Sequence, residues 1–355
     1  MGSVKIVHGG LDTAELRSLG LRPEQVLDFS ANISPMGPSP RVRRAVADAN
    51  LAAYPDRSSL LLRESLAARL NVGIDNLLVG NGSTELIHLL ARSCLRPGEQ
   101  CLIFTPTFAE YEAAATMVGA QIHRIQASEE QGFRWSLDTA SATISELRPR
   151  LVFLCNPNNP TGVYLECDAV DQLRAAVGRD GLFVLDDAYA SLAARQWDPL
   201  PILGSGNVAI LRSLTKDHAL AGVRLGYLVA QSTVVSTARQ LQYAWSVNAV
   251  AQAAGVAALE DAGHVVAARE VVREAKAYLY NRLETLGIPV TASAANFLLA
   301  NVGDATRIRT ALLRRGIAVR DCTSFGLPEH VRIAARRPEE CVHLVEALRD
   351  VLVEE

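Results

Sequence analysis

The middle of the chain alternates between short apolar runs and segments of helical periodicity, and this alternation restricts the fold more than any other feature. Six segments, all but residues 121–125 apolar along most of their length, are predicted to be strands, at residues 77–79, 100–104, 121–125, 151–155, 182–185 and 208–211. Between them, helices are predicted at residues 86–94, 108–118, 140–147 and 168–177. Strands that are apolar along nearly their whole length, separated by helices, form a mostly parallel sheet covered on both faces. The sequence therefore predicts an α/β protein whose active site lies at the carboxyl ends of the strands.

The first forty residues do not show this alternation of strands and helices. Three prolines between residues 35 and 40 exclude regular structure there, so residues 1–40 are predicted to form an extended arm that joins the small domain. A poorly ordered leader is the alternative. After the arm, helical periodicity is present at residues 41–53 and 58–70.

The last third of the chain is predicted to form a second, smaller domain. Residues 245–286 carry a helical pattern, interrupted near Gly263, that suits a connecting element. Residues 290–353 are predicted to form strand, helix, strand, strand and helix in turn. We therefore expect a large cofactor-binding domain over residues 41–245, and a connecting helix with a small α/β domain over residues 246–355.

The composition disfavours several classes of function. The 355 residues carry a formal net charge of -3, which gives no electrostatic reason to bind nucleic acid or an anionic membrane. The six cysteines are scattered without a C-x-x-C pair, so we expect neither a disulfide framework nor a metal site. The first residues lack the apolar core of a signal peptide, and no run of about 20 apolar residues occurs. We therefore expect a cytoplasmic protein that acts on a small molecule.

One stretch, SLTKDHALAGVRLGY at residues 213–227, has the chemistry of a cofactor socket. Lys216 is the only lysine in the middle of the chain, and an unprotonated lysine amine can form a Schiff base with an aldehyde. Ser213, Thr215 and Arg224 offer the hydroxyls and the guanidinium that bind a phosphate monoester. A solvated surface lysine beside turn residues is the alternative. An aldehyde and a phosphate on one cofactor describe pyridoxal phosphate (PLP).

Two further segments offer groups that PLP requires. Gly82, Ser83 and Thr84 lie between a predicted strand and a predicted helix, where unpaired N–H groups can hold a phosphate. N-capping explains the two hydroxyl residues equally well. Asp186 directly follows an apolar strand and is our choice for the carboxylate that keeps the PLP ring nitrogen protonated. The alternative is an aspartate that caps a turn, and Asp187, one residue later, should point elsewhere.

Two arginines near the end of the chain, Arg320 and Arg332, lie on neighbouring predicted strands. Arg332 is set in an apolar strand, where an unpaired guanidinium is costly, so it needs a bound anion or a structural salt bridge. In the N-terminal arm, His8 and Asn32 are polar groups that could face a ligand. We expect these four residues to bind the substrate, with a phosphate as the anion.

These segments together resemble the fold type I PLP enzymes, the aspartate aminotransferase superfamily. S-L-T-K followed by Arg224 and L-G-Y carries the resemblance, as does the string CNPNNPTG at residues 155–162, and the similarity covers almost the whole chain. It implies a three-layer PLP-transferase fold, with a large domain and a small α/β C-terminal domain. It also implies a homodimer with shared active sites, in which Tyr54 reaches the cofactor phosphate of the neighbouring subunit.

The resemblance assigns roles to further residues. Asn159 would hydrogen-bond the phenolic oxygen of PLP, and Tyr189 would donate to the same oxygen. Phe108 would stack on the pyridine ring, although an aromatic residue at the head of a predicted helix can also be simple core. In the superfamily, the arginine at the place of Arg332 binds the substrate carboxylate. The predicted catalytic residues are Lys216, Asp186 and Tyr189.

Within the superfamily, the sequence is most similar to the histidinol-phosphate aminotransferase branch, and inside that branch to threonine-phosphate decarboxylases of cobalamin biosynthesis. The strings FSANISPMGP, PTFAEYE and RDCTSFGLP carry this finer resemblance, whereas Asp217 and His218 stand where those decarboxylases usually have aromatic residues. The similarity implies a PLP-dependent carboxy-lyase or aminotransferase, with decarboxylation of a phospho-amino acid ahead of transamination. A non-catalytic effector-binding domain, of the kind fused to transcription regulators, is the alternative from another class, and no basic patch in the sequence supports it.

Overall fold

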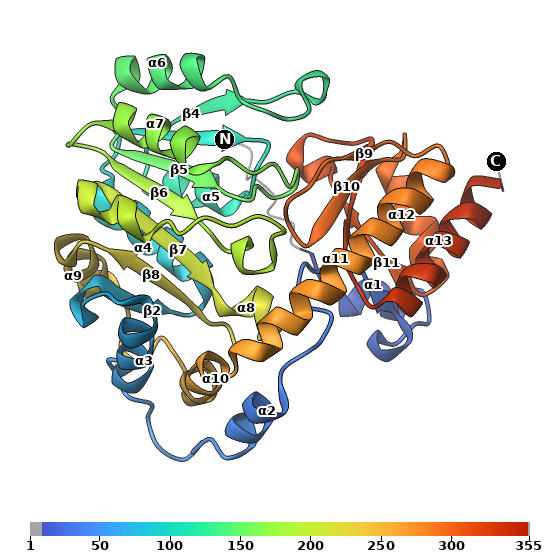
Figure 1. The fold of residues 1–355 in the computed structure, drawn as a ribbon, viewed down its shortest axis with the longest axis horizontal. Helices are drawn as coiled ribbons and strands as arrows, with labels where there is room; N and C mark the ends of the chain where they lie inside the picture. The colour runs from blue at the N-terminus through green and yellow to red at the C-terminus, as the bar shows by residue number, and fades with distance from the viewer. Residues whose placement is uncertain (1–8, 354–355) are drawn as a thin grey trace.

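The structure is a computed structural model and describes residues 9–353. Its larger part is built on a seven-stranded sheet of order β2-β8-β7-β6-β5-β3-β4 (Figure 1). Neighbours from β7 to β4 pair in parallel, whereas β8 is antiparallel to both β7 and β2. The prediction of a mostly parallel sheet is therefore confirmed. The strands are β2 (Leu77–Gly80), β3 (Gln100–Thr105), β4 (Gln121–Gln126), β5 (Leu151–Cys155), β6 (Leu182–Asp186), β7 (Val208–Ser213) and β8 (Gly226–Ala230).

Helices cover both faces of this sheet, because successive residues of a strand point to opposite sides. On one face, Ile103 and Phe153 pack with residues of α4 and α5, and on the other Leu102 and Val152 pack with residues of α6 and α7. At the β2 edge, α3 and α10 share a core with the sheet. The three layers are visible in Figure 1. The helices of this part are α2 (Pro40–Ala47), α3 (Leu60–Leu70), α4 (Gly82–Cys94), α5 (Glu110–Met117), α6 (Leu137–Leu147), α7 (Cys167–Val177), α8 (Leu214–Asp217), α9 (Ser232–Leu241) and α10 (Ala249–Leu259).

The smaller part is an antiparallel four-stranded sheet, of order β12-β13-β10-β9, packed against three helices. Leu283 of α11, Ile308 of α12 and Leu344 of α13 are fully buried in one core with Ile333 of the sheet. Helix α11 runs from beside the large sheet into this core and joins the two parts (Figure 1). The elements are α11 (Ala262–Thr285), β9 (Val290–Thr291), β10 (Phe297–Asn301), α12 (Ala305–Arg314), β12 (Arg320–Asp321), β13 (His330–Ala334) and α13 (Pro338–Val353).

The N-terminal arm packs on the smaller part. Strand β1 (Leu27–Asp28) pairs in parallel with β11 (Ile317–Ala318), and Phe29 is fully buried in the same core as α11. Helix α1 (Thr13–Ser18) places Leu16 against Leu313. The described part of the arm is therefore anchored by apolar contacts and does not trail as a leader.

The structure differs from the sequence-based expectation where the chain leaves the large sheet. The helix expected at residues 41–53 ends at Ala47, because the side chain of Asn50 accepts a hydrogen bond from the amide of Ala52 and forms a turn. The pattern at residues 245–286 is two helices that break at Glu260 and Asp261, whereas Gly263 lies inside the first turn of α11. Strand β8 and helix α9 are not predicted. The first two residues of β8, Gly226 and Tyr227, belong to the lysine motif, so that only a three-residue apolar run at residues 228–230 remains to mark a strand.

The packing of helix α10 assigns it to the larger part of the molecule. It packs against α2 and α3, in the same core as Leu77 of β2 and Val229 of β8. The expected division at residues 245 and 246 would separate this helix from its neighbours. We propose placing the boundary at the turn between α10 and α11.

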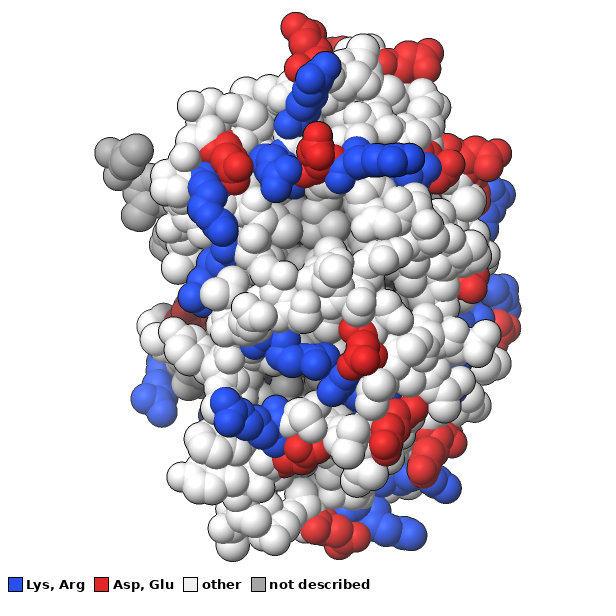
Figure 2. All heavy atoms as spheres, turned by 90° about the vertical axis from the view of Figure 1, so that its left-hand side faces the viewer, with Lys and Arg blue, Asp and Glu red and all other residues white. Residues whose placement is uncertain are grey.

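Figure 2 shows one face of the molecule, on which Lys and Arg are interspersed with Asp and Glu among uncharged residues. Among residues 9–353, no helix has the length and apolarity needed to cross a bilayer. The same residues include no group of three or more His, Cys, Asp and Glu placed to hold a metal ion.

Candidate active site

A cavity of about 620 Å³ opens at the carboxyl ends of β5, β6 and β7, where the large sheet faces the arm and the smaller part. Each of these three strands ends in a residue that lines it: Cys155, Asp186 and Ser213. The fold thus brings together side chains that lie far apart in the sequence. The predicted site residues that line the cavity are Asn32, Ser83, Thr84, Phe108, Asn159, Asp186, Tyr189, Ser213, Thr215, Lys216, Arg224 and Arg332.

Lys216 lies in the short helix α8, whose first turn is capped by the Ser213 side chain accepting a hydrogen bond from the amide of Thr215. Its Nζ is 5.8 Å from the centre of the Tyr189 ring. Burial lowers the pKa of Lys216 to about 8, the nearby charge of Arg332 acts in the same direction, and Asp186 opposes them. An appreciable fraction of this amine is therefore neutral near neutral pH, as addition to an aldehyde requires.

One end of the cavity is formed by the start of α4. Gly82 has a φ of 76°, and a Cβ on it would lie 2.6 Å from Nη2 of Arg224, so only glycine lets the guanidinium approach the helix start. Arg224 itself has a φ of 61°, a backbone conformation that is uncommon outside glycine and concentrates at functional sites. Ser83 and Thr84 follow in the first turn. Unpaired N–H groups of a helix start together with a guanidinium can hold a phosphate.

The floor of the cavity is Asp186, which is only 3% exposed. Its Oδ2 accepts a hydrogen bond from the Tyr111 hydroxyl at 2.6 Å, and its Oδ1 accepts one from the amide of Ala188 at 3.1 Å. Burial raises the pKa of Asp186, although these two hydrogen bonds and Lys216 favour its charged form. Sequence reasoning missed Tyr111, although it lies three residues after Phe108 in the helix predicted at residues 108–118, a spacing that would put both side chains on one face.

Asp187 points away from the cavity. Its Oδ2 accepts a hydrogen bond from Nε of Arg212 at 2.9 Å, and burial raises its pKa to about 7. Neighbouring residues at the end of a strand face opposite sides, which explains why Asp186 lines the cavity and Asp187 does not.

The string CNPNNPTG forms a wall of the cavity. Asn156 donates to the carbonyl of Leu165 at 2.9 Å, and Asn158 donates to the carbonyl of Pro106 at 2.9 Å, so both hold the turn together. Asn159 instead lines the cavity, where its amide oxygen accepts a hydrogen bond from Arg332. Two asparagines are therefore structural, and the third is exposed to a ligand.

Two aromatic residues complete the walls. Phe108 lies two residues before α5, rather than within that helix, and its ring meets the Tyr111 ring edge-on with centres 5.7 Å apart. Tyr189 follows the end of β6 and packs edge-on against Phe297 of β10, with centres 5.3 Å apart. Both side chains line the cavity.

Arg320 and Arg332 are directly opposite each other on β12 and β13. Arg332 is 4% exposed, and its Nη2 donates to the carbonyl of Ser30 at 2.7 Å, while its Nε is buried without a partner in the described chain. Its hydrogen-bond partners are neutral oxygen atoms. Arg320 donates to the hydroxyl of Ser324 at 2.6 Å and lines a second hollow, of about 440 Å³, that adjoins the first at Ser30. The structure therefore places Arg320 beside the cavity and not in it.

The N-terminal arm closes the cavity from the opposite side. The amide of Ser34 donates to the carbonyl of Lys216 at 2.7 Å, a contact that no motif in the sequence predicts. Asn32 is buried close to the Tyr189 hydroxyl, and neither atom of its amide group makes a hydrogen bond of good geometry within residues 9–353. An unpartnered buried amide beside a cavity is a group that a bound ligand can satisfy. His8, also predicted to bind substrate, lies outside the described residues.

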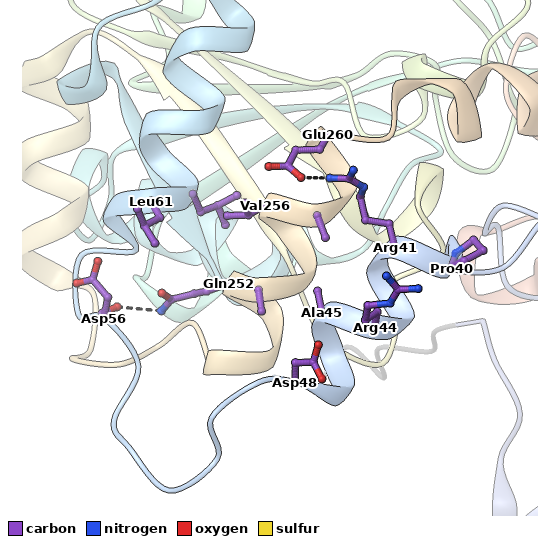
Figure 3. Close-up of a pocket in the computed structure, with 13 residues that line it drawn as sticks. Pro40, Arg41, Arg44, Ala45, Asp48, Asp56, Leu61, Gln252, Val256 and Glu260 are labelled. Carbon is purple, nitrogen blue, oxygen red and sulfur yellow. Dashed lines mark hydrogen bonds and ion pairs between the residues drawn. The ribbon is translucent and has the colours of Figure 1, made fainter.

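Tyr54 does not reach the cavity of its own chain. It is 81% exposed and stacks on Trp245, with ring centres 4.6 Å apart. Near the loop that carries it, a surface hollow of about 750 Å³ lies between α2, α3 and α10 (Figure 3). Apolar side chains such as Leu61 and Val256 line it, and an ion pair between Arg41 and Glu260 lies at its edge. This larger hollow has no lysine, serine or threonine, so its lining offers no amine or hydroxyl for chemistry.

The chain is similar to known proteins over most of its length. The family model of aminotransferase class I and II matches residues 24–348. The histidinol-phosphate aminotransferase of Symbiobacterium thermophilum is 40% identical, over 95% of this chain and 93% of its own. That of Moorella thermoacetica is 36% identical, over 95% and 87%. Among solved structures, the histidinol-phosphate aminotransferase of Sinorhizobium meliloti in complex with pyridoxal-5'-phosphate aligns with a TM-score of 0.87 and 24% identity, over 96% of this chain and 94% of that chain. This structural likeness shows the fold.

We predict that Lys216→Met stabilises the cofactor-free protein near neutral pH. Folding lowers the pKa of this amine from 10.5 to about 8, so between pH 8 and pH 10.5 the unfolded chain binds more protons than the folded one. Below pH 8 the amine is charged in both states, and its buried charge destabilises the folded state by the full amount. The free energy of unfolding, measured with urea, should rise by about 3 kcal/mol near neutral pH, and the gain should vanish above about pH 11.

Lys276→Met is the matched control. The pKa of Lys276 is also lowered to about 8, but its Nζ donates to the carbonyls of Ser293 and Ala295 at 2.6 Å each. Methionine would leave both carbonyls without a donor, so this variant should be destabilised. A gain from Lys216→Met that is equal at all pH values would contradict the account of this amine.

Proposed function

Because this chain belongs to the family of class I and II aminotransferases, which are PLP-dependent enzymes, we propose that it transfers the amino group of histidinol phosphate to a 2-oxo acid. The relatives named above support this proposal better than threonine-phosphate decarboxylation, which the finer sequence strings favour. They offer no support for a lyase or for cobalamin biosynthesis. They are also enzymes by name, which leaves the effector-binding alternative without support.

The observation that carries the substrate proposal is the buried charge of Arg332. A guanidinium that is 4% exposed and hydrogen-bonded to neutral oxygen atoms, with Asp28 as a nearby carboxylate, favours a further anion in the cavity, since a buried charge without a hydrogen-bonded counter-ion is costly. Histidinol phosphate has a phosphate and an amine but no carboxylate. Its phosphate would take the place at Arg332, with Arg320 and Asn32 nearby, and no carbon dioxide could leave it.

The residues of the cavity fit PLP. Gly82 leaves room for Arg224 at the helix start, Asp186 is a buried carboxylate at the floor, and Asn32 has an unsatisfied amide group. When bound, PLP supplies an aldehyde that captures the amine and a ring that accepts the electron pair left at the substrate carbon. The proposed phosphate-binding residues are Gly82, Ser83, Thr84, Ser213, Thr215 and Arg224. The proposed contacts of the ring are Phe108, Asn159, Asp186 and Tyr189.

Lys216 is proposed to move the proton. Its Nζ is neutral often enough to take a proton from the amine-bearing carbon of the substrate and to hold it until it is returned. Asp186 would hold a proton between its carboxylate and the ring nitrogen. Tyr189, whose pKa burial raises to about 12, stays protonated and can donate a hydrogen bond throughout.

We further propose that two copies of the chain associate through the face that carries Tyr54. Leu51, Tyr54, Leu61 and Tyr243 are large apolar side chains that are each more than 70% exposed. Exposed apolar side chains of this size are typical of a surface that another molecule covers. In such a homodimer the partner's Tyr54 would bind the cofactor phosphate, and each site would be incomplete without the other chain.

We predict that the PLP-loaded protein forms glutamate from 2-oxoglutarate when histidinol phosphate is the amino donor. Because two charge-assisted hydrogen bonds to the phosphate are lost with histidinol, kcat/KM for histidinol should be lower by roughly two to three orders of magnitude. Arg332→Gln should remove most of this preference. The matched control is Arg349→Gln, because Arg349 is an exposed arginine paired with Asp350.

The same assay includes O-phosphothreonine, with carbon dioxide and glutamate followed together. If O-phosphothreonine releases carbon dioxide without glutamate, and histidinol phosphate does not react, the proposed transamination is wrong. Decarboxylation of a phospho-amino acid would then be the function.

We predict that the protein sediments as a dimer and that Tyr54→Phe weakens PLP binding about tenfold while the dimer persists. Tyr243→Phe is the matched control, because Tyr243 is equally exposed but is not expected to contact the cofactor. A wild-type protein that sediments as a monomer, or a Tyr54→Phe variant that binds PLP as tightly as the wild type, would contradict the shared site.

A further inference from the structure

Tyr111 of α5 is held rigidly beside the cavity. The residue is fully buried, and its ring stacks on Phe153 of β5 with centres 4.9 Å apart and an angle of 14° between the planes. The ring of Phe108 meets it edge-on at 5.7 Å. Because two other rings fix the phenol, its hydroxyl has little freedom to leave Asp186.

The hydroxyl of Tyr111 is one of two donors that fix the Asp186 carboxylate. It donates to Oδ2 at 2.6 Å, and the amide of Ala188 donates to Oδ1 at 3.1 Å. A carboxylate oxygen can accept more than one hydrogen bond, so both oxygens retain capacity for a further donor. Tyr111 and Asp186 both line the cavity, where such a donor would lie.

The two adjacent aspartates have donors of different charge. Asp187 pairs with the guanidinium of Arg212 at 2.9 Å, which neutralises its charge. Asp186 instead receives a neutral phenol, which orients the carboxylate and leaves its negative charge available. A guanidinium at this place would cancel the charge and with it the preference for a cationic ring nitrogen.

We propose that Tyr111 is a positioning residue, whose hydrogen bond sets the orientation of the Asp186 carboxylate toward the ring nitrogen of the cofactor. This inference rests on the proposed function, in which Asp186 pairs with that nitrogen. Tyr111 does not itself take part in the reaction.

Loss of the Tyr111 hydroxyl would change the pH dependence of cofactor binding. The groups that face Asp186 are Tyr111 from α5, Cys155 from β5, Asp187 and Tyr189 from the end of β6, and Lys216 from α8. Burial raises the pKa of Asp186, and the hydrogen bond from Tyr111 is the largest effect that opposes it. Loss of the hydroxyl therefore raises this pKa further, so that Asp186 takes up a proton at a higher pH. A protonated Asp186 cannot pair with a protonated ring nitrogen, and affinity is lost on the acid side.

The test is the dissociation constant of PLP for Tyr111→Phe, measured by titrating the cofactor-free protein at a series of pH values. Phenylalanine keeps the ring and its stacking and removes only the hydroxyl. We expect binding about ten- to a hundredfold weaker near neutral pH, as for loss of a hydrogen bond to a charged group. The deficit should grow as the pH falls.

Two further variants separate positioning from packing. Tyr164→Phe removes a hydroxyl that accepts a hydrogen bond from the amide of Trp197 outside the cavity, and its affinity should stay within about twofold of the wild type. Phe153→Leu removes the stacking and keeps the Tyr111 hydroxyl, and should shift the pH dependence in the same direction by less.

An independent readout does not involve the cofactor. In the cofactor-free protein, the infrared carbonyl band of protonated Asp186, identified by its loss in Asp186→Asn, should appear at a higher pH in Tyr111→Phe than in the wild type. A weakening of PLP binding that is equal at every pH, or an unchanged band, would overturn the proposal. A wild-type protein that binds no PLP would instead overturn the proposed function.

Discussion

The removal of charged groups from water is the constraint on which the site depends. Lys216, Asp186 and Arg332 face one cavity, and burial is the largest cause of the pKa shift of each. Burial and Arg332 lower the pKa of Lys216, whereas Asp186 opposes them. In the proposed function, the buried charge of Arg332 would favour a ligand that carries an anion.

The fold brings these groups together from three parts of the chain. The strands of the large sheet end at the cavity and present Asp186 and the start of the lysine motif. Arg332 connects the smaller part to the other two parts. Its guanidinium donates hydrogen bonds to Asn159, in the part that contains the large sheet, and to the carbonyl of Ser30 in the arm. The arm in turn donates from Ser34 to the carbonyl of Lys216. A displacement of the arm would therefore alter the surroundings of Lys216 and of Arg332 together.

Much of this could be predicted from the sequence, for identifiable physical reasons. Strands buried on both faces are recognisable as apolar runs, and the side-chain period of a strand correctly separates Asp186 from Asp187. Lys216 and Asn159 were recognised by motif and do line the cavity.

Other features depend on contacts between distant residues and could not be predicted in this way. Tyr111 resembles a core aromatic until the fold places Asp186, 75 residues later, against its hydroxyl. Arg320 is paired in register with Arg332, yet its side chain turns to Ser324 and a separate hollow, which strand pairing alone does not determine. Strand β8 is missed because its first two residues, Gly226 and Tyr227, belong to the lysine motif, which leaves an apolar run of only three residues after it.

The central claim is that Lys216 is the residue that holds PLP, and borohydride reduction of the loaded protein tests it most directly. Reduction fixes the cofactor to the lysine that carries it, and peptide mass spectrometry then identifies that lysine among the three in the chain: Lys5, Lys216 and Lys276. Lys276 is the real competitor, since its pKa is also lowered to about 8, but its amine is held by two carbonyls. The account predicts the label on Lys216 alone. A label on Lys276 or Lys5, or none at all, would contradict it.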